Sequence, residues 1–312
     1  MDRQEAYILQ RGFSANTRLA ELAIPPVQRR WFHLTSFHTR KGGKPSSGRD
    51  WNRHGVLFLP LIFRQQQHPL NLLMSKVWTW GNSVWLIDAA RYLPSSARID
   101  GFDTDTTQCP PKEWLPSNVS IYNLDCCVPF PDHLIGKYDI VHVQLFRLAF
   151  DGANSAAVIT NLISLLKPGG WISWGELDYS ELAIVKTEGG KEVGDDLLQL
   201  WEVMGTLGGT KPSWAADGWV PALPDLFREN GLVNVAADNR RFPLELLPQV
   251  LDVTLMSAEE ISYKVLDRMQ NGSGDHCRAL IARVHGDRQK AAYNAGRLTV
   301  VGQRPLTSSN VS

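Results

Sequence analysis

The chain has 312 residues, enough to bury a large core, and its 32 basic and 32 acidic side chains leave no formal net charge. This balance offers no basic surplus for a nucleic-acid backbone or an anionic membrane surface. The longest apolar run, Val56 to Phe63, is interrupted by Pro60 and is too short to cross a bilayer. We therefore expect a soluble, cytoplasmic protein with neither nucleic acid nor a membrane as its partner.

The sequence does not predict a metal site. The four cysteines have no metal-ligand spacing, and neither have the four histidines between residues 33 and 68. The adjacent Cys126 and Cys127 are more typical of reduced packing residues than of a disulfide.

Residues 1–75 are predicted to form an N-terminal helical cap that contains a flexible insert. Apolar residues such as Leu19 and Leu22 favour an amphipathic helix near the start. The stretch from Arg40 to Asn52 is rich in glycine, serine and basic residues without periodicity, which is typical of a flexible loop.

A strand–turn–helix–strand unit organises the rest of the chain. A short apolar run around Val77 predicts a strand, and Gly81 breaks it before a helix that Asn82 or Ser83 can cap. A second strand ends at Asp103, about 20 residues beyond the turn, where a nucleotide-binding βαβ unit places its ribose-binding carboxylate.

Further strands alternate with helices. A third strand precedes Asp125, a fourth reads KYDIVHVQ, and LKPGG separates an apolar helix from a fifth strand around Ile172. Two more strands are expected around Val233 and Val300. The alternation predicts an α/β fold with a doubly wound sheet, whose strands present acids at one cleft edge.

The stretch SVWLIDAARYLPSSARIDGFD resembles the nucleotide-binding half of class I S-adenosylmethionine-dependent methyltransferases, and YDIVH and LKPGG support the resemblance. It is most similar to the fungal secondary-metabolism branch that includes the LaeA-like regulators. The resemblance implies a mostly parallel, seven-stranded, Rossmann-like methyltransferase domain over residues 76–306 with a helical cap. It also implies helical lid insertions at 186–215 and 245–290.

The resemblance further implies S-adenosyl-L-methionine as cofactor and assigns its binding residues. Asp103 matches the acid that binds the ribose, and Asp125 matches the acid that binds the adenine edge, although Asp125 could instead simply cap a loop. The full set of expected cofactor residues is Trp80, Gly81, Asn82, Ser83, Asp103, Thr104, Asp125, Cys126 and Gln144. The glycine loop departs from the family pattern. Aligned without gaps, only its middle glycine survives, whereas aligned on the strand, two residues are missing and Thr79 replaces the acid.

No spacing assigns a catalytic residue. His142 and Glu176 lie near the ends of the fourth and fifth strands, where either could meet a substrate. Two interpretations remain open. One is a methyltransferase that acts on a small secondary metabolite. The alternative is a protein of this fold that does not methylate and serves as an accessory factor to a pathway enzyme, a cyclase or a LaeA-like regulator.

Overall fold

The computed structural model describes residues 71–75, 86–87, 89–91, 93–107, 109–146, 155–205 and 218–306, and of residues 71–75 it describes the backbone. The predicted N-terminal cap up to residue 70, its flexible insert and the loop residues Trp80, Gly81, Asn82 and Ser83 lie outside these ranges. So does the end of the first predicted lid insertion, from residue 206.

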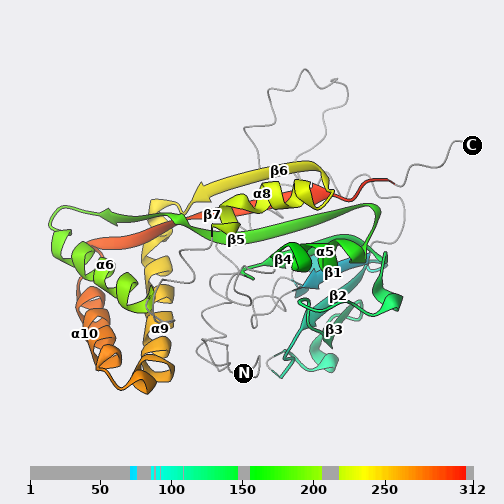
Figure 1. The fold of residues 1–312 in the computed structure, drawn as a ribbon. Coiled ribbons are helices and arrows are strands. Elements are labelled where there is room, and N and C mark those ends of the chain that lie inside the picture. Colours follow the sequence, from blue (N-terminus) through cyan, green and yellow to red (C-terminus); the bar gives the residue numbers. More distant parts are fainter. Residues whose placement is uncertain are drawn as a thin grey trace, which may run out of the picture.

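The described strands form one seven-stranded sheet in the order β3-β2-β1-β4-β5-β7-β6 (Figure 1). The pairings among β1 to β5 are parallel, whereas β7 runs antiparallel to both β5 and β6. The strands are β1 (Asn71–Ser75), β2 (Arg98–Asp103), β3 (Val119–Asn123), β4 (Tyr138–Gln144), β5 (Leu166–Lys186), β6 (Val233–Arg241) and β7 (Ala291–Gln303). Short 3₁₀ helices occupy Lys112–Trp114, Asp132–Leu134, Leu244–Leu246 and Leu266–Met269.

The first strand lies upstream of its predicted position around Val77. Its sequence, NLLMS, has none of the aromatic or β-branched residues that make the later run VWTW look strand-like. Pairing decides the position, because Leu72 and Met74 align with both β2 and β4. The sheet therefore begins before residue 76, the predicted start of the nucleotide-binding domain.

Gly101 lets the helical segment around residues 86–91 pack directly on β2. A Cβ atom at this position would lie 2.6 Å from Cδ1 of Leu86, closer than carbon atoms can approach. Leu86 is buried in a small cluster with Ala89, Ile99 and Ile140. The GFD sequence at the end of β2 thus combines a glycine needed for close helix–strand packing with the acid that follows it.

We expect Gly101→Ala to destabilise the protein by about 1–3 kcal/mol, the usual cost of overpacking a well-filled core. Chemical denaturation measures this change in the free energy of unfolding. Gly286→Ala is the matched control, because nothing lies within 4 Å of a Cβ atom there. Equal stability of the two variants would show that Leu86 moves aside without cost.

The helix α5 (Ser155–Leu165) ends directly before LKPGG, as the sequence predicts, and LKPGG forms the first five residues of β5. Gly169 adopts a φ of +80°, a left-handed conformation that glycine adopts without strain. The Lys167 ammonium forms an ion pair with Asp139 at 2.8 Å, so the turn is also tied to β4. The helices α5 and α8 (Trp219–Glu229) lie on the same side of the sheet (Figure 1).

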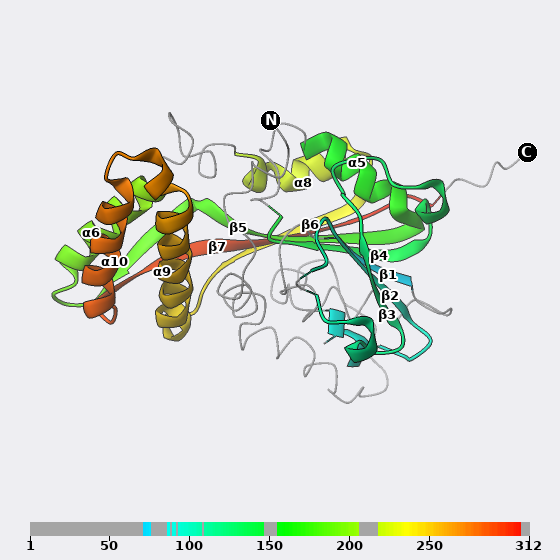
Figure 2. The same cartoon turned by 90° about the horizontal axis from the view of Figure 1, so that it is seen from below.

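Three helices form a lobe at the far end of the long β5–β7 pair, away from β1 to β3 (Figures 1 and 2). They are α6 (Lys191–Gly205), α9 (Leu247–Lys264) and α10 (Ser273–Gly286), and they fall within the predicted lid insertions. Arg283 of α10 donates two hydrogen bonds to Asp196 of α6, at 3.0 and 2.8 Å. These bonds lower the pKa of Asp196 below its usual value.

The lobe corrects one local prediction. SAEE from Ser257 has the pattern of a capping box and predicts a helix start, but α9 runs through it without a break. The Ser257 hydroxyl donates to the carbonyl of Val253 one turn earlier. A serine in a continuous helix can make this bond instead of capping, and the apolar residues on both sides keep the helix intact.

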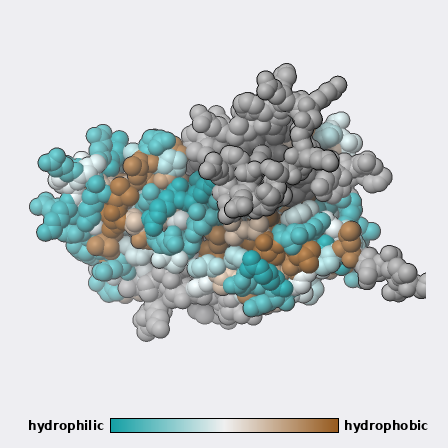
Figure 3. Space-filling model, turned by 90° about the horizontal axis from the view of Figure 1, so that it is seen from above, coloured by the Kyte–Doolittle hydropathy of each residue, from teal (hydrophilic) through white to brown (hydrophobic). Residues whose placement is uncertain are grey.

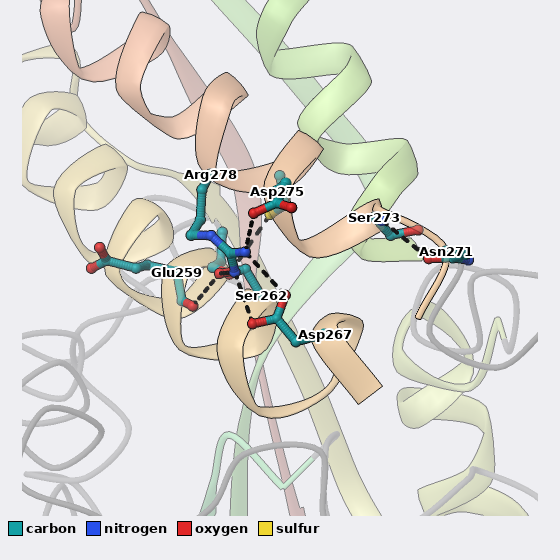
Figure 4. Close-up of polar contacts among 9 residues, drawn as sticks. Glu259, Ser262, Asp267, Asn271, Ser273, Asp275 and Arg278 are labelled. Carbon is teal, nitrogen blue, oxygen red and sulfur yellow. Dashed lines mark hydrogen bonds and ion pairs between the residues drawn. The ribbon is translucent and has the colours of Figure 1, made fainter. Parts of the chain in front are cut away.

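Arg278 of α10 links the end of α9 to the start of α10 through hydrogen bonds (Figure 4). Its guanidinium donates to Asp267 at 3.1 Å, to Asp275 at 2.5 Å and to the hydroxyl of Ser262 at 3.2 Å, and it lies 4.5 Å from the centre of the Tyr263 ring. These acceptors raise the pKa of Arg278, Asp267 first. The cluster has its charges satisfied internally, which is typical of a structural contact.

The surface of the lobe is largely hydrophilic, with a narrower hydrophobic band between the polar groups (Figure 3). Leu198 of α6 is among its exposed apolar side chains. Within the described ranges, no helix combines the length and apolar character needed to cross a membrane.

Candidate functional site

The candidate site lies at the carboxyl edge of the parallel strands, where the strand order reverses. β1 has β2 and β3 on one side and β4 and β5 on the other, so the chain departs in opposite directions from this point. Open α/β sheets bind ligands outside the carboxyl ends of strands at such a switch point.

The register places the candidate residues on one face of this edge. Met74 of β1 aligns with Gly101 on one side and with His142 on the other. Side chains two residues apart on a strand share a face, so Asp103 and Gln144 follow on the same face as His142. The packed segment at 86–91 covers this face further back, because Leu86 contacts Gly101 and Ile140.

Asp103 is the last residue of β2, and a hydrogen bond holds its carboxylate in place. The residue is 6% exposed, and Oδ1 accepts a hydrogen bond of 3.0 Å from the backbone N–H of Asp105. The carbonyl of the neighbouring Thr104 accepts a bond from the Asn123 amide of β3, at 3.0 Å. The loop after β2 is therefore held to β3 before any ligand binds, which reduces the ordering cost of binding.

Asp125 lies just beyond β3 and has the same local geometry. Its Oδ1 accepts a hydrogen bond of 2.8 Å from the backbone N–H of Cys127. Asp125 therefore does cap the loop, which was one of the two roles expected for it. A capping bond to one oxygen is compatible with ligand binding. Cys126 beside it is buried against Phe102 and Phe130 in the main core, and its carbonyl accepts from Asn161.

Gln144 and His142 form the central part of the site. His142 Nε2 lies 3.4 Å from Oε1 of Gln144, and His142 is largely buried. On the neighbouring strand, Gly175 aligns with Gln144. A Cβ atom at Gly175 would meet Cγ of Gln144 at 3.8 Å and the Thr299 hydroxyl at 3.9 Å, so no side chain of β5 separates these two polar groups.

Glu176 faces the opposite side of the sheet from His142. Its Oε1 accepts the indole N–H of Trp174 at 2.8 Å and the backbone N–H of Phe146 at 2.6 Å. The Trp174 ring packs edge-on against Trp219 of α8, which identifies the helix-covered face. His142 and Glu176, paired by the sequence as candidates, therefore do not meet.

Glu176 instead holds the turn that follows β4. Leu145 has a φ of +53°, a left-handed conformation that costs a leucine about 1–2 kcal/mol. The N–H of Leu145 donates to the carbonyl of Gly175 at 2.8 Å, and the N–H of Phe146 donates to Glu176. These two bonds fix a strained turn directly after Gln144.

The sequence allows Trp201 and Trp214 to line a flat aromatic pocket, although a packing role in the core is the favoured interpretation. Trp201 of α6 packs against β5 and β7, with its ring centre 5.0 Å from that of Tyr179 and 5.8 Å from that of Tyr293. Trp214 lies outside the described residues.

Sequence reasoning missed Arg297 of β7, which lies on the same face as Thr299. Its Nε is buried without a hydrogen-bond partner, and the described residues offer its guanidinium no ion pair. An unsatisfied buried donor costs about 1–3 kcal/mol. The centre of the Phe242 ring lies 4.7 Å from the guanidinium carbon, and this cation–π contact stabilises the Arg297 cation by about 0.5–2 kcal/mol. A charged residue inside the strand pattern RLTVVGQ was the available signal.

No metal site is found in the described part of the chain, where no group of three or more histidine, cysteine and acidic side chains could hold an ion.

Comparisons with known proteins point to methyltransferases from fungi. No family model matches the chain. The methyltransferase grgD of a Penicillium species is 35% identical over 154 residues, which cover 46% of this chain and 53% of that protein. The N-methyltransferase tcpN of Claviceps purpurea (strain 20.1) is 28% identical over 48% of this chain and 51% of that protein. The chain thus spans about half the length of the curated relatives it matches.

Among solved structures, similarity is found to Haemonchus contortus phosphoethanolamine N-methyltransferase 2 in complex with phosphomonomethylethanolamine and S-adenosylhomocysteine. The match covers 79% of this chain and 52% of that one, at 14% identity and a TM-score of 0.43.

Proposed function

We propose that the protein is an S-adenosyl-L-methionine-dependent methyltransferase that acts on a small secondary metabolite. One observation carries the proposal: Asp103, His142 and Gln144 share one face at the carboxyl edge of a sheet whose strand order reverses there. The sequence similarity to two fungal methyltransferases supports the same reaction class.

The residues present fit the nucleoside half of this cofactor. Asp103 and Asp125 follow adjacent parallel strands, and carboxylates at these positions can accept hydrogen bonds from ribose hydroxyls and an adenine amino group. Thr104 and Cys126 follow these two acids directly in the chain, and Gln144 ends β4 on the other side of β1. For the methionine end we propose the backbone N–H groups of Trp80, Gly81, Asn82 and Ser83, where the sequence predicts the start of a helix.

The cofactor supplies an activated methyl group on a sulfonium, so the protein chiefly has to bind, orient and exclude water. Gln144 can orient an acceptor through its amide, because the turn after it is fixed by Glu176 and Gly175. His142 contacts Gln144 on the same face and can accept the proton that the acceptor loses. Glu176, on the other face, acts only through the position of the turn.

We further propose a cytoplasmic enzyme of the fungal branch that includes the LaeA-like regulators, with a small-molecule substrate and a pathway enzyme as its partner. The domain that performs the reaction would comprise residues 71–306, with the lobe of α6, α9 and α10 as its lid.

Calorimetric titration with S-adenosylmethionine and S-adenosylhomocysteine tests the proposal. We expect saturable binding of both, with micromolar to submillimolar dissociation constants. A panel of amine, hydroxyl and carbon acceptors should then reveal methyl transfer from labelled cofactor. Absence of binding at millimolar cofactor would refute the methyltransferase function. Binding without turnover on any acceptor would favour the non-methylating alternative.

A further inference from the structure

Arg297 differs from Arg98, Arg278 and Arg283 in the charges that surround it. Hydrogen bonds to acidic side chains raise the pKa values of Arg98, Arg278 and Arg283. Burial lowers the pKa of Arg297, and the nearby positive charge of Arg240 lowers it further. The protein therefore places this cation in an environment that disfavours it.

The acid that acts on Arg297 is already engaged, because Asp238 forms an ion pair with Arg240 at 2.7 Å. Asp178 of β5 lies on the opposite face of the sheet, since it aligns with Gly296 whereas Arg297 aligns with Leu177. The guanidinium of Arg297 thus lies beside an aromatic ring, a second arginine and one acid that already has a cationic partner.

The position of Arg297 connects it to the candidate site. It aligns with Leu177 of β5, two residues beyond Gly175, and Thr299 lies between it and the site on the same face. Across the side-chain-free position at Gly175, Thr299 and Gln144 are two strand spacings apart, about 10 Å. A small molecule anchored at Arg297 can therefore reach over Thr299 and Gly175 to the edge where Gln144 lies.

We propose that Arg297 binds a carboxylate of the methyl acceptor, and that the acceptor is a small anionic molecule with an apolar, ring-bearing body. The planar guanidinium matches a carboxylate, and the Phe242 ring beside it offers an apolar contact. A bound carboxylate would also provide the acceptor that the buried Nε lacks. The inference rests on the proposed function for its choice of the acceptor, but the anion site can be tested separately.

Two probes of equal shape measure the preference for charge. Phenylacetate and the neutral phenylacetamide are titrated into the 312-residue chain, with and without saturating S-adenosylhomocysteine, and binding is followed by ligand-observed NMR. We expect the wild-type protein to bind phenylacetate at least tenfold more tightly than phenylacetamide. In Arg297→Met this preference should disappear, and in Arg297→Lys it should be reduced.

Arg240→Met is the matched control, because it removes a neighbouring arginine that already has an acid partner. It should retain the preference for phenylacetate. Arg297→Met should unfold at the same temperature as wild type or higher, since it removes a charge that burial disfavours. This separates ligand binding from a structural role, for which the variant would be less stable.

Equal binding of the two probes to wild type, or undetectable binding of both, would overturn the inference, as would a preference that survives in Arg297→Met. Unchanged affinity of Arg297→Met for S-adenosylhomocysteine is expected. If the wild-type protein does not bind S-adenosylhomocysteine, the proposed function fails, while the titrations without it still decide whether Arg297 forms an anion site.

Discussion

Replacing Asp103 by alanine is expected to weaken binding of S-adenosylhomocysteine at least tenfold and to leave the protein folded. Its carboxylate lies at the end of β2, on the same face of the sheet as Gln144. Each hydrogen bond to a charged acceptor is worth about 1.5–3 kcal/mol, and about 1.4 kcal/mol corresponds to a tenfold change in affinity. Loss of two such bonds to a ribose would give the tenfold change or more.

Two variants separate the charge from the loop geometry. Asp103→Asn keeps an oxygen that can accept the N–H of Asp105, so its affinity should fall between wild type and Asp103→Ala. Asp132→Ala removes an exposed acid elsewhere and should bind normally. Calorimetric titration gives the dissociation constants, and circular dichroism confirms folding. A folded Asp103→Ala protein with wild-type affinity would refute the assignment.

Glu176→Ala is expected to lower the free energy of unfolding by about 3–6 kcal/mol. The variant leaves the indole N–H of Trp174 and the N–H of Phe146 without their buried charged acceptor, and each such loss costs about 1.5–3 kcal/mol. It also frees the strained turn at Leu145. Urea denaturation, with fluorescence of the buried tryptophan as one signal, measures the change.

Glu176→Gln retains an oxygen acceptor and should lose less stability than Glu176→Ala. Trp174→Phe removes one of the two donors and keeps most of the ring. If the turn positions Gln144, Glu176→Ala should also bind S-adenosylhomocysteine more weakly at temperatures where it is fully folded. A stability within 0.5 kcal/mol of wild type would contradict the role of Glu176 in holding this turn.

Local sequence signals predicted most elements of the described fold. The strand YDIVHVQ, the LKPGG turn and the strand that ends at Asp103 lie where apolar patterns and glycines place them. These signals succeed because backbone geometry and burial act over a few residues. They fail for β1, where NLLMS has little strand preference of its own and is selected by pairing on both sides.

The sequence by itself determined that Asp103 and Gln144 end strands and that Asp125 follows one. The sequence could not determine on which face of the sheet each of these side chains lies. Strand register decides that Asp103, His142 and Gln144 lie on one side of the sheet, whereas Glu176 lies on the other with Trp174.

Only the tertiary structure revealed Arg297. Its significance depends on residues far away in the chain, because Gly175 leaves space beside Thr299 and Asp238 is held by Arg240. Local patterns report the helix or strand propensity of a segment. Whether a charged side chain finds a partner depends instead on which groups lie close together once β5, β6 and β7 have paired. The physical reason is that desolvation and pairing depend on distance in space rather than on position along the chain.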